Sequence, residues 1–197
     1  MKLILASGST IRAEMLRNAG VEVETQVARV DEATIKGSML AQNARPRDIA
    51  DTLAEMKARR VAMKYPEALV LGADQVLVCD GKLFDKPETV EEARSQLKTL
   101  RGRAHELLSA AVIFENGQPV WRHTGRAQLI IREFSDEFLD AYIAEQGDDL
   151  LTTVGAYKLE GAGAQLFSRV QGDYFSVLGL PLLEVLEFLR SRGVCIK

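Results

Sequence analysis

The sequence predicts an α/β fold in which a mixed, twisted sheet is flanked by helices. Short apolar runs typical of buried strands alternate along the chain with segments whose apolar residues recur at helical spacing. Two turn signals, Asp80-Gly81 and Asn116-Gly117, follow apolar runs and predict hairpins, so antiparallel pairs should accompany parallel ones. The 197 residues contain no internal repeat and no low-complexity linker, and we expect a single domain over residues 1–197.

The first half of the chain is interpreted from its apolar spacing and its capping residues. In chain order it predicts a strand at 3–6, a helix at 11–19, an extended stretch at 21–30, a mobile polar loop at 33–47 and a helix at 48–65. Ser9 or Thr10 is a natural N-cap for the first helix, and Gly20 ends it. The second helix should turn four apolar side chains toward the core: Ile49, Leu53, Met56 and Val61.

The second half alternates strands and helices in the same way. It predicts strands at 68–73 and 76–79, a return strand at 83–84, a helix at 87–101, strands at 104–115 and 119–134, a helix to about 145, a glycine-rich irregular stretch at 155–167, a short strand at 175–178 and a helix at 181–192. Ser135 should cap the helix that follows it. Pro181 suits a first helical turn, and Gly193 suits the end of the last helix.

Composition and charge exclude several classes of protein. Hydrophobic residues make up 47% and charged residues 27%, which is normal for a soluble globular chain. The net charge of −3 argues against broad nucleic-acid binding, which needs a basic face. Cys79 and Cys195 lack metal-site spacing and read as small apolar residues in a reduced compartment. No apolar run suits a signal peptide or a membrane span, so we expect a cytoplasmic protein without membrane contact.

The turn from the first strand into the first helix is a candidate anion site. Ser7, Gly8, Ser9 and Arg12 bring two hydroxyls, a glycine, a helix N-terminus and a guanidinium together within six residues. Free backbone N–H groups and an arginine fork at such a turn suit a phosphate. An ordinary N-cap with a surface arginine explains the same residues about equally well.

Asp74 stands inside an apolar strand, in Gly72-Ala73-Asp74-Gln75-Val76. A carboxylate there is costly unless it is paired, binds a metal or faces a cleft, and these conditions favour a functional role over a structural bend. Lys57, Lys86 and the Asp31-Glu32 pair add charges that could serve a phosphate or a metal. Taken singly, each of them is equally typical of a solvated surface.

Together these segments resemble the Maf family of nucleotide pyrophosphatases over nearly the whole chain. The resemblance rests on an ordered series of motifs: Leu5-Ala-Ser-Gly-Ser-x-x-Arg12, Val30-Asp-Glu32, Leu53-Ala-x-x-Lys57-Ala58, Gly72-Ala-Asp74, Lys86-Pro87, Leu100-x-Gly-Arg-x-His105, Gly155-Ala-Tyr157, Glu160-Gly161, Gly172-Asp-Tyr174 and Val177-x-Gly-Leu-Pro-Leu182. Each motif alone is weak, whereas their order and spacing along one chain are specific.

The resemblance implies hydrolysis of a nucleoside triphosphate between its α and β phosphates with a divalent cation, which we expect to be Mg²⁺. It also implies two lobes around a central cleft, as in inosine-triphosphate pyrophosphatases, and a possible homodimer. By position, Asp74 would accept a proton or bind the metal, and Glu32 would help to hold that metal. The phosphate site would be lined by five side chains: Ser7, Ser9, Arg12, Lys57 and Lys86.

Three positions separate two Maf subfamilies, and here they hold Ile11, Gln75 and Lys158. Gln75 and Lys158 match the group that acts on 7-methyl-GTP, whereas Ile11 matches neither group. The resemblance therefore favours house-cleaning of a modified purine nucleotide. Alternatives are hydrolysis of dTTP, UTP or a broad set of nucleotides, and a nucleotide-binding regulator of septum formation.

Overall fold

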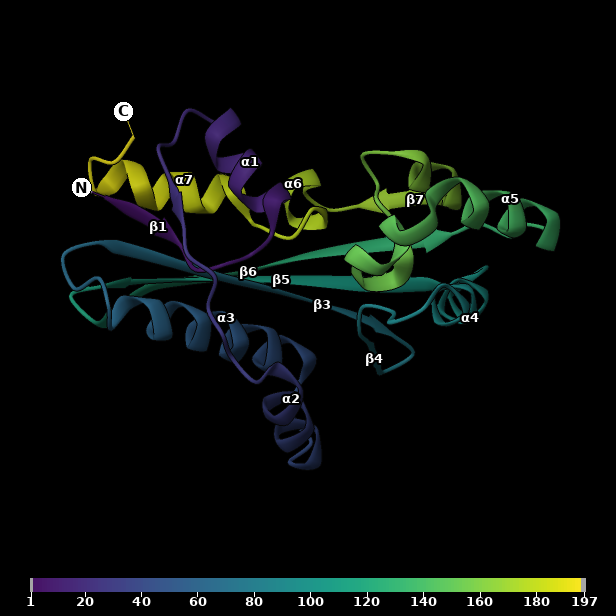
Figure 1. The fold of residues 1–197 in the computed structure, drawn as a ribbon, viewed down its shortest axis with the longest axis horizontal. Coiled ribbons are helices and arrows are strands. Elements are labelled where there is room, and N and C mark those ends of the chain that lie inside the picture. The colour runs from purple at the N-terminus through teal and green to yellow at the C-terminus, as the bar shows by residue number, and fades with distance from the viewer. Residues whose placement is uncertain (1, 196–197) are drawn as a thin grey trace. The chain divides into compact units, whose positions relative to one another are not determined.

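The computed structural model describes residues 2–195, which form two compact units (Figure 1). Unit 1 contains the chain up to Gln75, residues 108–125 and the chain from Asp173 onward, whereas unit 2 contains residues 76–107 and 126–172. Three long strands contribute to both units: β3 (Leu69–Cys79), β5 (Ala104–Glu115) and β6 (Gln118–Ile131). Parallel and antiparallel pairs occur together and helices flank the strands, which confirms the predicted α/β class.

The sheet of unit 1 has the strand order β2-β1-β3-β5-β6. β1 (Leu3–Leu5) is fully buried and pairs in parallel with β3 on one side and with β2 (Glu24–Thr25) on the other. Asn116 and Gly117 both have positive φ in the turn between β5 and β6, as the hairpin signal predicts. The extended stretch expected at 21–30 contains only β2, because the rest of it pairs with no strand among the described residues.

Helices cover both faces of this sheet. α1 (Thr10–Asn18) and α7 (Leu182–Ser191) lie on one face and α3 (Pro46–Ala62) on the other (Figure 1). Side chains of β1 and β3 alternate between the faces, and Leu3 and Leu5 share a core with α1 and α7. Within residues 2–195, no helix has the length and apolar character needed to cross a membrane.

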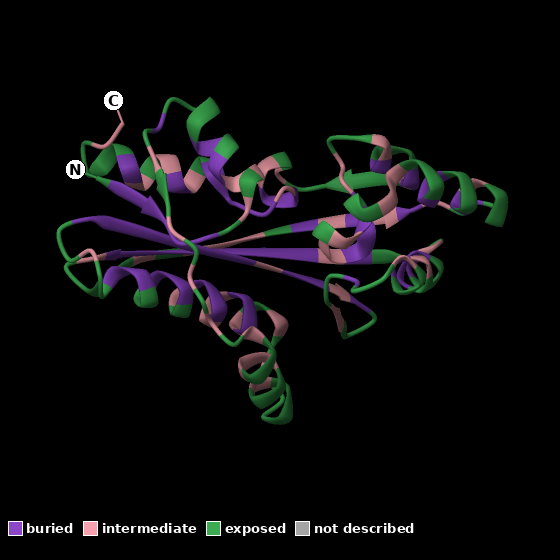
Figure 2. Ribbon diagram, viewed as in Figure 1, coloured by how far each residue is buried: buried purple, intermediate pink, exposed green. Residues whose placement is uncertain are grey.

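The prediction of a mobile polar loop at 33–47 is wrong, because most of this segment lies in the helix α2 (Glu32–Ala41). The Asp31 side chain caps this helix by accepting a hydrogen bond from the backbone N–H of Thr34 at 3.1 Å. None of the ten described residues of α2 is buried (Figure 2). The sequence of this helix therefore lacks the apolar periodicity by which a helix is recognised. In α3 the predicted core residue Met56 is 40% exposed, so that part of the helix prediction is also wrong.

α6 (Tyr174–Val177) is a short helix where the sequence predicted a strand at 175–178. The Asp173 carboxylate accepts a hydrogen bond from the backbone N–H of Ser176 at 2.7 Å and caps the helix. The cap outweighs the strand preference of Phe175 and Val177 because it satisfies a backbone donor locally.

Two short strands of unit 2 pair with the long strands of the same sheet. β4 (Lys82–Phe84) pairs in antiparallel fashion with β3, which confirms the return strand. β7 (Phe167–Gln171) pairs in antiparallel fashion with β6 and was not predicted, since four of its five residues are exposed and its alternation is weak. Three 3₁₀ helices, rather than an irregular stretch alone, precede β7: Gly147–Thr152, Val154–Ala156 and Ala162–Leu166.

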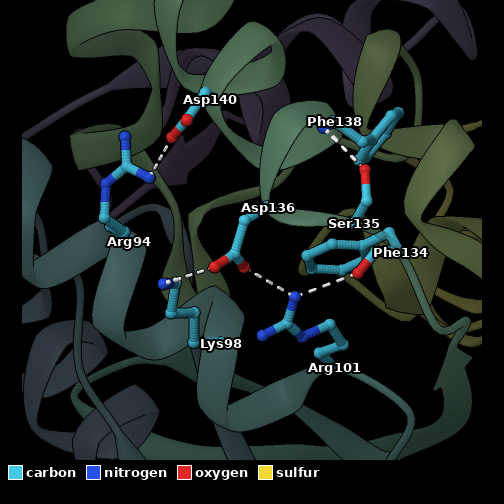
Figure 3. A network of polar contacts seen from close by, with 8 residues as sticks. All are labelled: Arg94, Lys98, Arg101, Phe134, Ser135, Asp136, Phe138 and Asp140. Carbon is cyan, nitrogen blue, oxygen red and sulfur yellow. Dashed lines mark hydrogen bonds and ion pairs between the residues drawn. The ribbon is translucent and has the colours of Figure 1, made fainter.

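Ion pairs connect the two α-helices of unit 2, α4 (Val90–Leu100) and α5 (Asp136–Gln146) (Figure 3). Asp136 accepts from Arg101 at 2.8 Å and from Lys98 at 3.2 Å, while Arg94 pairs with Asp140. Ser135 caps α5 by accepting from a backbone N–H at 3.2 Å, as predicted. Hydrogen bonds from Arg101 and Lys98 lower the pKa of Asp136 from its ordinary value.

Candidate active site

Lys57 bridges two carboxylates within unit 1. Its ammonium lies 2.6 Å from Asp74 Oδ1 and 2.8 Å from Glu32 Oε1. Lys57 comes from α3, Asp74 from β3 and Glu32 from the first turn of α2, so three separate elements meet at this point. Lys57 is 9% exposed and Asp74 is 5% exposed. The structure thus brings together three residues that the sequence had singled out independently.

Gly72 explains how Lys57 and Asp74 come within reach of each other. A Cβ atom at Gly72 would lie 2.1 Å from the Ala54 carbonyl oxygen and 2.7 Å from the Ala58 backbone nitrogen. The strand and the helix therefore touch through their backbones at this residue. Since Asp74 follows Gly72 by two positions, it faces the same side of the strand and meets the lysine next to Ala58.

One oxygen of Asp74 has no partner among residues 2–195. Oδ2 is buried and accepts no hydrogen bond from the residues that the structure describes, although Oδ1 is bound to Lys57. A buried carboxylate oxygen without a donor is costly, and native proteins rarely leave one unsatisfied. Oδ2 is therefore suited to receive a cation, a water molecule or a proton.

The residues fit a magnesium ion that is shared with a phosphate ligand. Among the described residues, no group of three His, Cys, Asp or Glu side chains is placed to hold a metal. Glu32 and Asp74 supply two carboxylates, and Asp74 has an oxygen that no residue of the described chain contacts by a hydrogen bond. Mg²⁺ is usually bound through one or two carboxylates, with substrate phosphates and water as its other ligands.

Arg12 is fixed beside Asp74 by hydrogen bonds to the main chain. Its Nε donates to the Gly179 carbonyl at 2.7 Å, and its Nη1 donates to the Ala73 carbonyl at 3.1 Å and to Ser7 Oγ at 3.2 Å. Burial lowers the pKa of Arg12 from its ordinary value, while the nearby carboxylates of Asp74 and Glu32 oppose that shift. Side-chain patterns in a sequence do not reveal the two carbonyl acceptors, which sequence reasoning therefore missed.

The hydroxyls of the two serines in the candidate anion site accept hydrogen bonds from residues of the same turn and helix. Ser7 Oγ is buried and accepts from Arg12 and from the Ser9 backbone N–H at 3.2 Å. Ser9 is the N-cap of α1, and Gly8 between the serines is exposed. The cap prediction is confirmed, and the cradle consists of an exposed glycine at a helix N-terminus beside a fixed arginine. Ile11, one of the proposed specificity positions, is half-buried in the first turn of α1.

Gln75 connects β3 to α6. Its amide nitrogen lies 2.9 Å from Ser109 Oγ, 3.1 Å from the Ser176 carbonyl and 3.0 Å from the Val177 carbonyl. Ser109 is fully buried on β5 and donates to the Ser176 carbonyl at 2.6 Å. Ser109 was missed because a serine within an apolar strand carries no motif. The amide N–H groups of Gln75 are therefore taken up by bonds that hold α6 against β3.

Two of the predicted site residues belong to unit 2. Lys86 is exposed between β4 and α4. Lys158 lies between the second and third 3₁₀ helices and forms an ion pair of 3.0 Å with Asp149 of the first. Their roles toward a phosphate or a base remain predictions from the family resemblance.

His105 forms a buried pair with Tyr157 in unit 2. Its Nε2 lies 2.6 Å from the tyrosine hydroxyl, and its Nδ1 is buried without a hydrogen-bond partner among the described residues. Burial lowers the pKa of His105 to about 4, so the ring is neutral at physiological pH, and burial raises the pKa of Tyr157. The pair is therefore suited to a structural role within unit 2.

Comparison with known proteins identifies the family. The sequence profile described as Maf-like protein matches residues 2–192. A protein of Ruegeria pomeroyi named nucleoside triphosphate pyrophosphatase is 56% identical over 192 residues, which cover 98% of this chain and 96% of that protein. A protein of Roseobacter denitrificans with the same name is 56% identical over 191 residues, covering 97% and 96%.

A solved structure is also similar, that of a nucleoside-triphosphatase, or dITP/XTP pyrophosphatase, from Mycobacterium abscessus. It has a TM-score of 0.38 and 19% sequence identity, and the match covers 66% of this chain and 73% of that chain. The family profile and the two close relatives each span nearly the whole sequence. The chain therefore belongs to the Maf-like protein family, as its series of motifs predicts.

Proposed function

We propose that this chain hydrolyses a nucleoside triphosphate to the nucleoside monophosphate and diphosphate. The observation that carries the proposal is the buried Asp74 carboxylate, whose Oδ2 has no partner among the described residues while Lys57 and Arg12 adjoin the same strand segment. The names of the two relatives from Ruegeria pomeroyi and Roseobacter denitrificans support the same activity.

The cations of unit 1 suit a polyphosphate. Arg12 uses Nε and Nη1 to hold its own position, and Nη2 makes no hydrogen bond to the residues described. A guanidinium fixed in this way can offer its remaining edge to a phosphate oxygen without losing its anchors. Lys57 supplies a second positive charge from α3. Lys86 would supply the third, as the family pattern implies.

Asp74 is suited to take the proton that hydrolysis releases. A water oxygen bonds to phosphorus, the bridging P–O bond breaks so that diphosphate leaves, and the water proton passes to a carboxylate. Asp74 Oδ2 is a buried acceptor without a partner among the described residues, on the carboxylate whose Oδ1 binds the Lys57 ammonium. In the alternative role, Asp74 would join Glu32 in holding a divalent cation, which we expect to be Mg²⁺ and which would neutralise the charge on phosphate oxygens.

The finer proposal is a preference for 7-methyl-GTP, which rests on the identities of Gln75 and Lys158. We further propose that the protein removes modified nucleotides (house-cleaning), that it acts in the cytoplasm and that it forms a homodimer. Ile11 offers neither a ring to stack on a base nor a guanidinium fork. Recognition of the base would therefore depend on residues other than Ile11.

Diphosphate release with magnesium tests the activity, using 7-methyl-GTP, dTTP, UTP, CTP, GTP and ITP. Asp74→Asn should lower turnover by at least about 100-fold, the usual scale of losing a general base, and should leave nucleotide binding in place. Asp80→Asn is a matched control, since Asp80 is exposed in the β3–β4 turn and asparagine tolerates its positive φ. Nucleotide binding without turnover in the wild type would favour the regulatory function.

A further inference from the structure

We infer that Lys57 and a divalent cation compete for the same two carboxylates. On this view, cation binding transfers the Lys57 ammonium from Asp74 and Glu32 to a phosphate oxygen of the ligand. The inference rests on the proposed function for the identity of that ligand, whereas the competition itself concerns only three side chains of unit 1.

Lys57 occupies carboxylate oxygens that a divalent cation would need. One ammonium lies 2.6 Å from Asp74 Oδ1 and 2.8 Å from Glu32 Oε1, so it engages an oxygen of each carboxylate at once. A cation bound to both carboxylates needs lone pairs on those groups, and Lys57 already uses part of them. Asp74 Oδ2, buried and without a partner in the described chain, is a position from which a cation can begin to displace the ammonium.

The charges of the site oppose simultaneous binding of Lys57 and a divalent cation. Two carboxylates, the Lys57 ammonium and the nearby Arg12 guanidinium together carry no net charge, and release of the ammonium leaves a charge of −1, which attracts a divalent cation. With the ammonium still in place, that cation would stand within a few ångströms of another positive charge in a buried site, where repulsion is weakly screened. Release of Lys57 from Asp74 and Glu32 removes this repulsion.

The side chain of Lys57 is suited to move, unlike that of Arg12. Lysine carries a compact charge on a flexible four-carbon chain, and the Lys57 side chain is 11% exposed. Arg12, in contrast, is held by three hydrogen bonds to Gly179, Ala73 and Ser7. Arg12 is thus the fixed cation of the site and Lys57 the movable one. A phosphate that binds together with the divalent cation offers the Lys57 ammonium a new acceptor in place of Asp74 and Glu32.

The test is a titration of the full chain with Mn²⁺ alone, followed by electron paramagnetic resonance of the free ion. Lys57→Met removes the competing charge and should tighten Mn²⁺ binding by about tenfold, a typical effect of one nearby charge. Lys57→Arg keeps the charge as a rigid fork that matches a carboxylate, and it should weaken Mn²⁺ binding. Lys64→Met is the matched control, because Lys64 is exposed just beyond α3, and it should leave the affinity unchanged.

Thermal unfolding provides a second readout of the same exchange. Lys57→Met leaves the carboxylate pair uncompensated, so the variant should melt below the wild type, and Mn²⁺ should raise its Tm by more than it raises that of the wild type. If Lys57→Met does not fold, Lys57→Gln takes its place in both measurements, because glutamine is uncharged but keeps a hydrogen-bond donor. Equal or weaker Mn²⁺ binding by the uncharged variants, with no larger gain in Tm, would overturn the inference.

These outcomes are independent of turnover. A wild type that releases diphosphate, combined with unchanged Mn²⁺ binding in Lys57→Met, would reject the exchange and keep the proposed function. Tighter Mn²⁺ binding in Lys57→Met, combined with no turnover of any nucleotide by the wild type, would keep the cation competition and reject the proposed function.

Discussion

Gly72 and Ala54 place a strand and a helix in direct backbone contact: a Cβ atom at Gly72 would stand 2.1 Å from the Ala54 carbonyl oxygen. Gly72→Ala should therefore push α3 away from β3 and reduce the free energy of unfolding by about 3 kcal/mol, the upper range for overpacking a core. Because Lys57 lies on α3, the same change should lower diphosphate release. Urea unfolding and the nucleotide assay measure the two effects.

Gly37→Ala is the matched control for that substitution. Gly37 lies in α2, and a Cβ atom there would contact nothing within 4 Å. Alanine is favoured over glycine inside a helix, so this variant should unfold at the same or a higher urea concentration. Equal stability of Gly72→Ala and Gly37→Ala would show that α3 and β3 are not in close contact.

Arg12→Lys tests whether the guanidinium is anchored by the main chain. A lysine ammonium cannot bond Gly179, Ala73 and Ser7 together from one planar group, so two carbonyls lose this donor and the buried Ser7 hydroxyl keeps only the Ser9 backbone N–H. We expect a loss of roughly 2 kcal/mol in unfolding free energy and a higher KM for nucleotide. Arg17→Lys, exposed on the same helix, should change neither quantity. A variant that alters only KM would limit Arg12 to ligand binding.

Gln75→Ala tests the connection between β3 and α6. The substitution removes the donor shared by Ser109 and the carbonyls of Ser176 and Val177, so α6 loses its attachment to the strand. Amide hydrogen exchange over residues 174–179 should become faster, with little change in α3. Gln118→Ala, at an exposed position of β6, serves as the control. A change in base preference without faster exchange would instead indicate direct contact between Gln75 and the nucleotide.

The His105–Tyr157 pair predicts how stability depends on pH. Burial lowers the pKa of His105 in the folded protein to about 4, below its ordinary value of 6.5. Below pH 6.5 the unfolded chain therefore binds a proton that the folded protein does not, and stability falls as the pH drops from 6.5 toward 4. The full effect is roughly 3 kcal/mol, given 1.36 kcal/mol for each pKa unit.

Urea unfolding at several pH values measures that slope. Carboxylates also titrate near the lower end of this range, so the comparison is with His105→Gln, which keeps hydrogen-bonding groups but has no titrating ring. The variant should show a smaller slope between pH 6.5 and 4. His123→Gln leaves His105 in place and should behave as the wild type. Identical slopes in all three proteins would exclude His105 as the source.

Much of the fold could be predicted because its buried elements carry strong local signals. β1 is an unbroken apolar run, and α1 and α5 begin at serine caps that the sequence displays. α2 was missed because helix periodicity reports burial on one side, and none of the residues in this helix is buried. β7 was missed for the corresponding reason, since it is mostly exposed.

The candidate site was only partly predictable. Asp74 was conspicuous because a carboxylate inside an apolar strand demands an explanation, and Lys57 and Glu32 were found by motif. Their mutual contact could not be read from the sequence, because it depends on how closely α3 approaches Gly72 in three dimensions. The carbonyls of Ala73 and Gly179 are invisible to any pattern of side chains.

The two carboxylates that contact Lys57 are supported very differently. Asp74 lies on a buried strand, where most substitutions disturb packing, whereas Glu32 begins a helix whose ten described residues include none that is buried. Substitutions at exposed positions usually change stability by less than about 0.5 kcal/mol. Sequence drift along α2 can therefore shift the position of Glu32 while the rest of unit 1 keeps its structure. This helix gives evolution, or an enzyme engineer, a way to retune the site that the core does not permit.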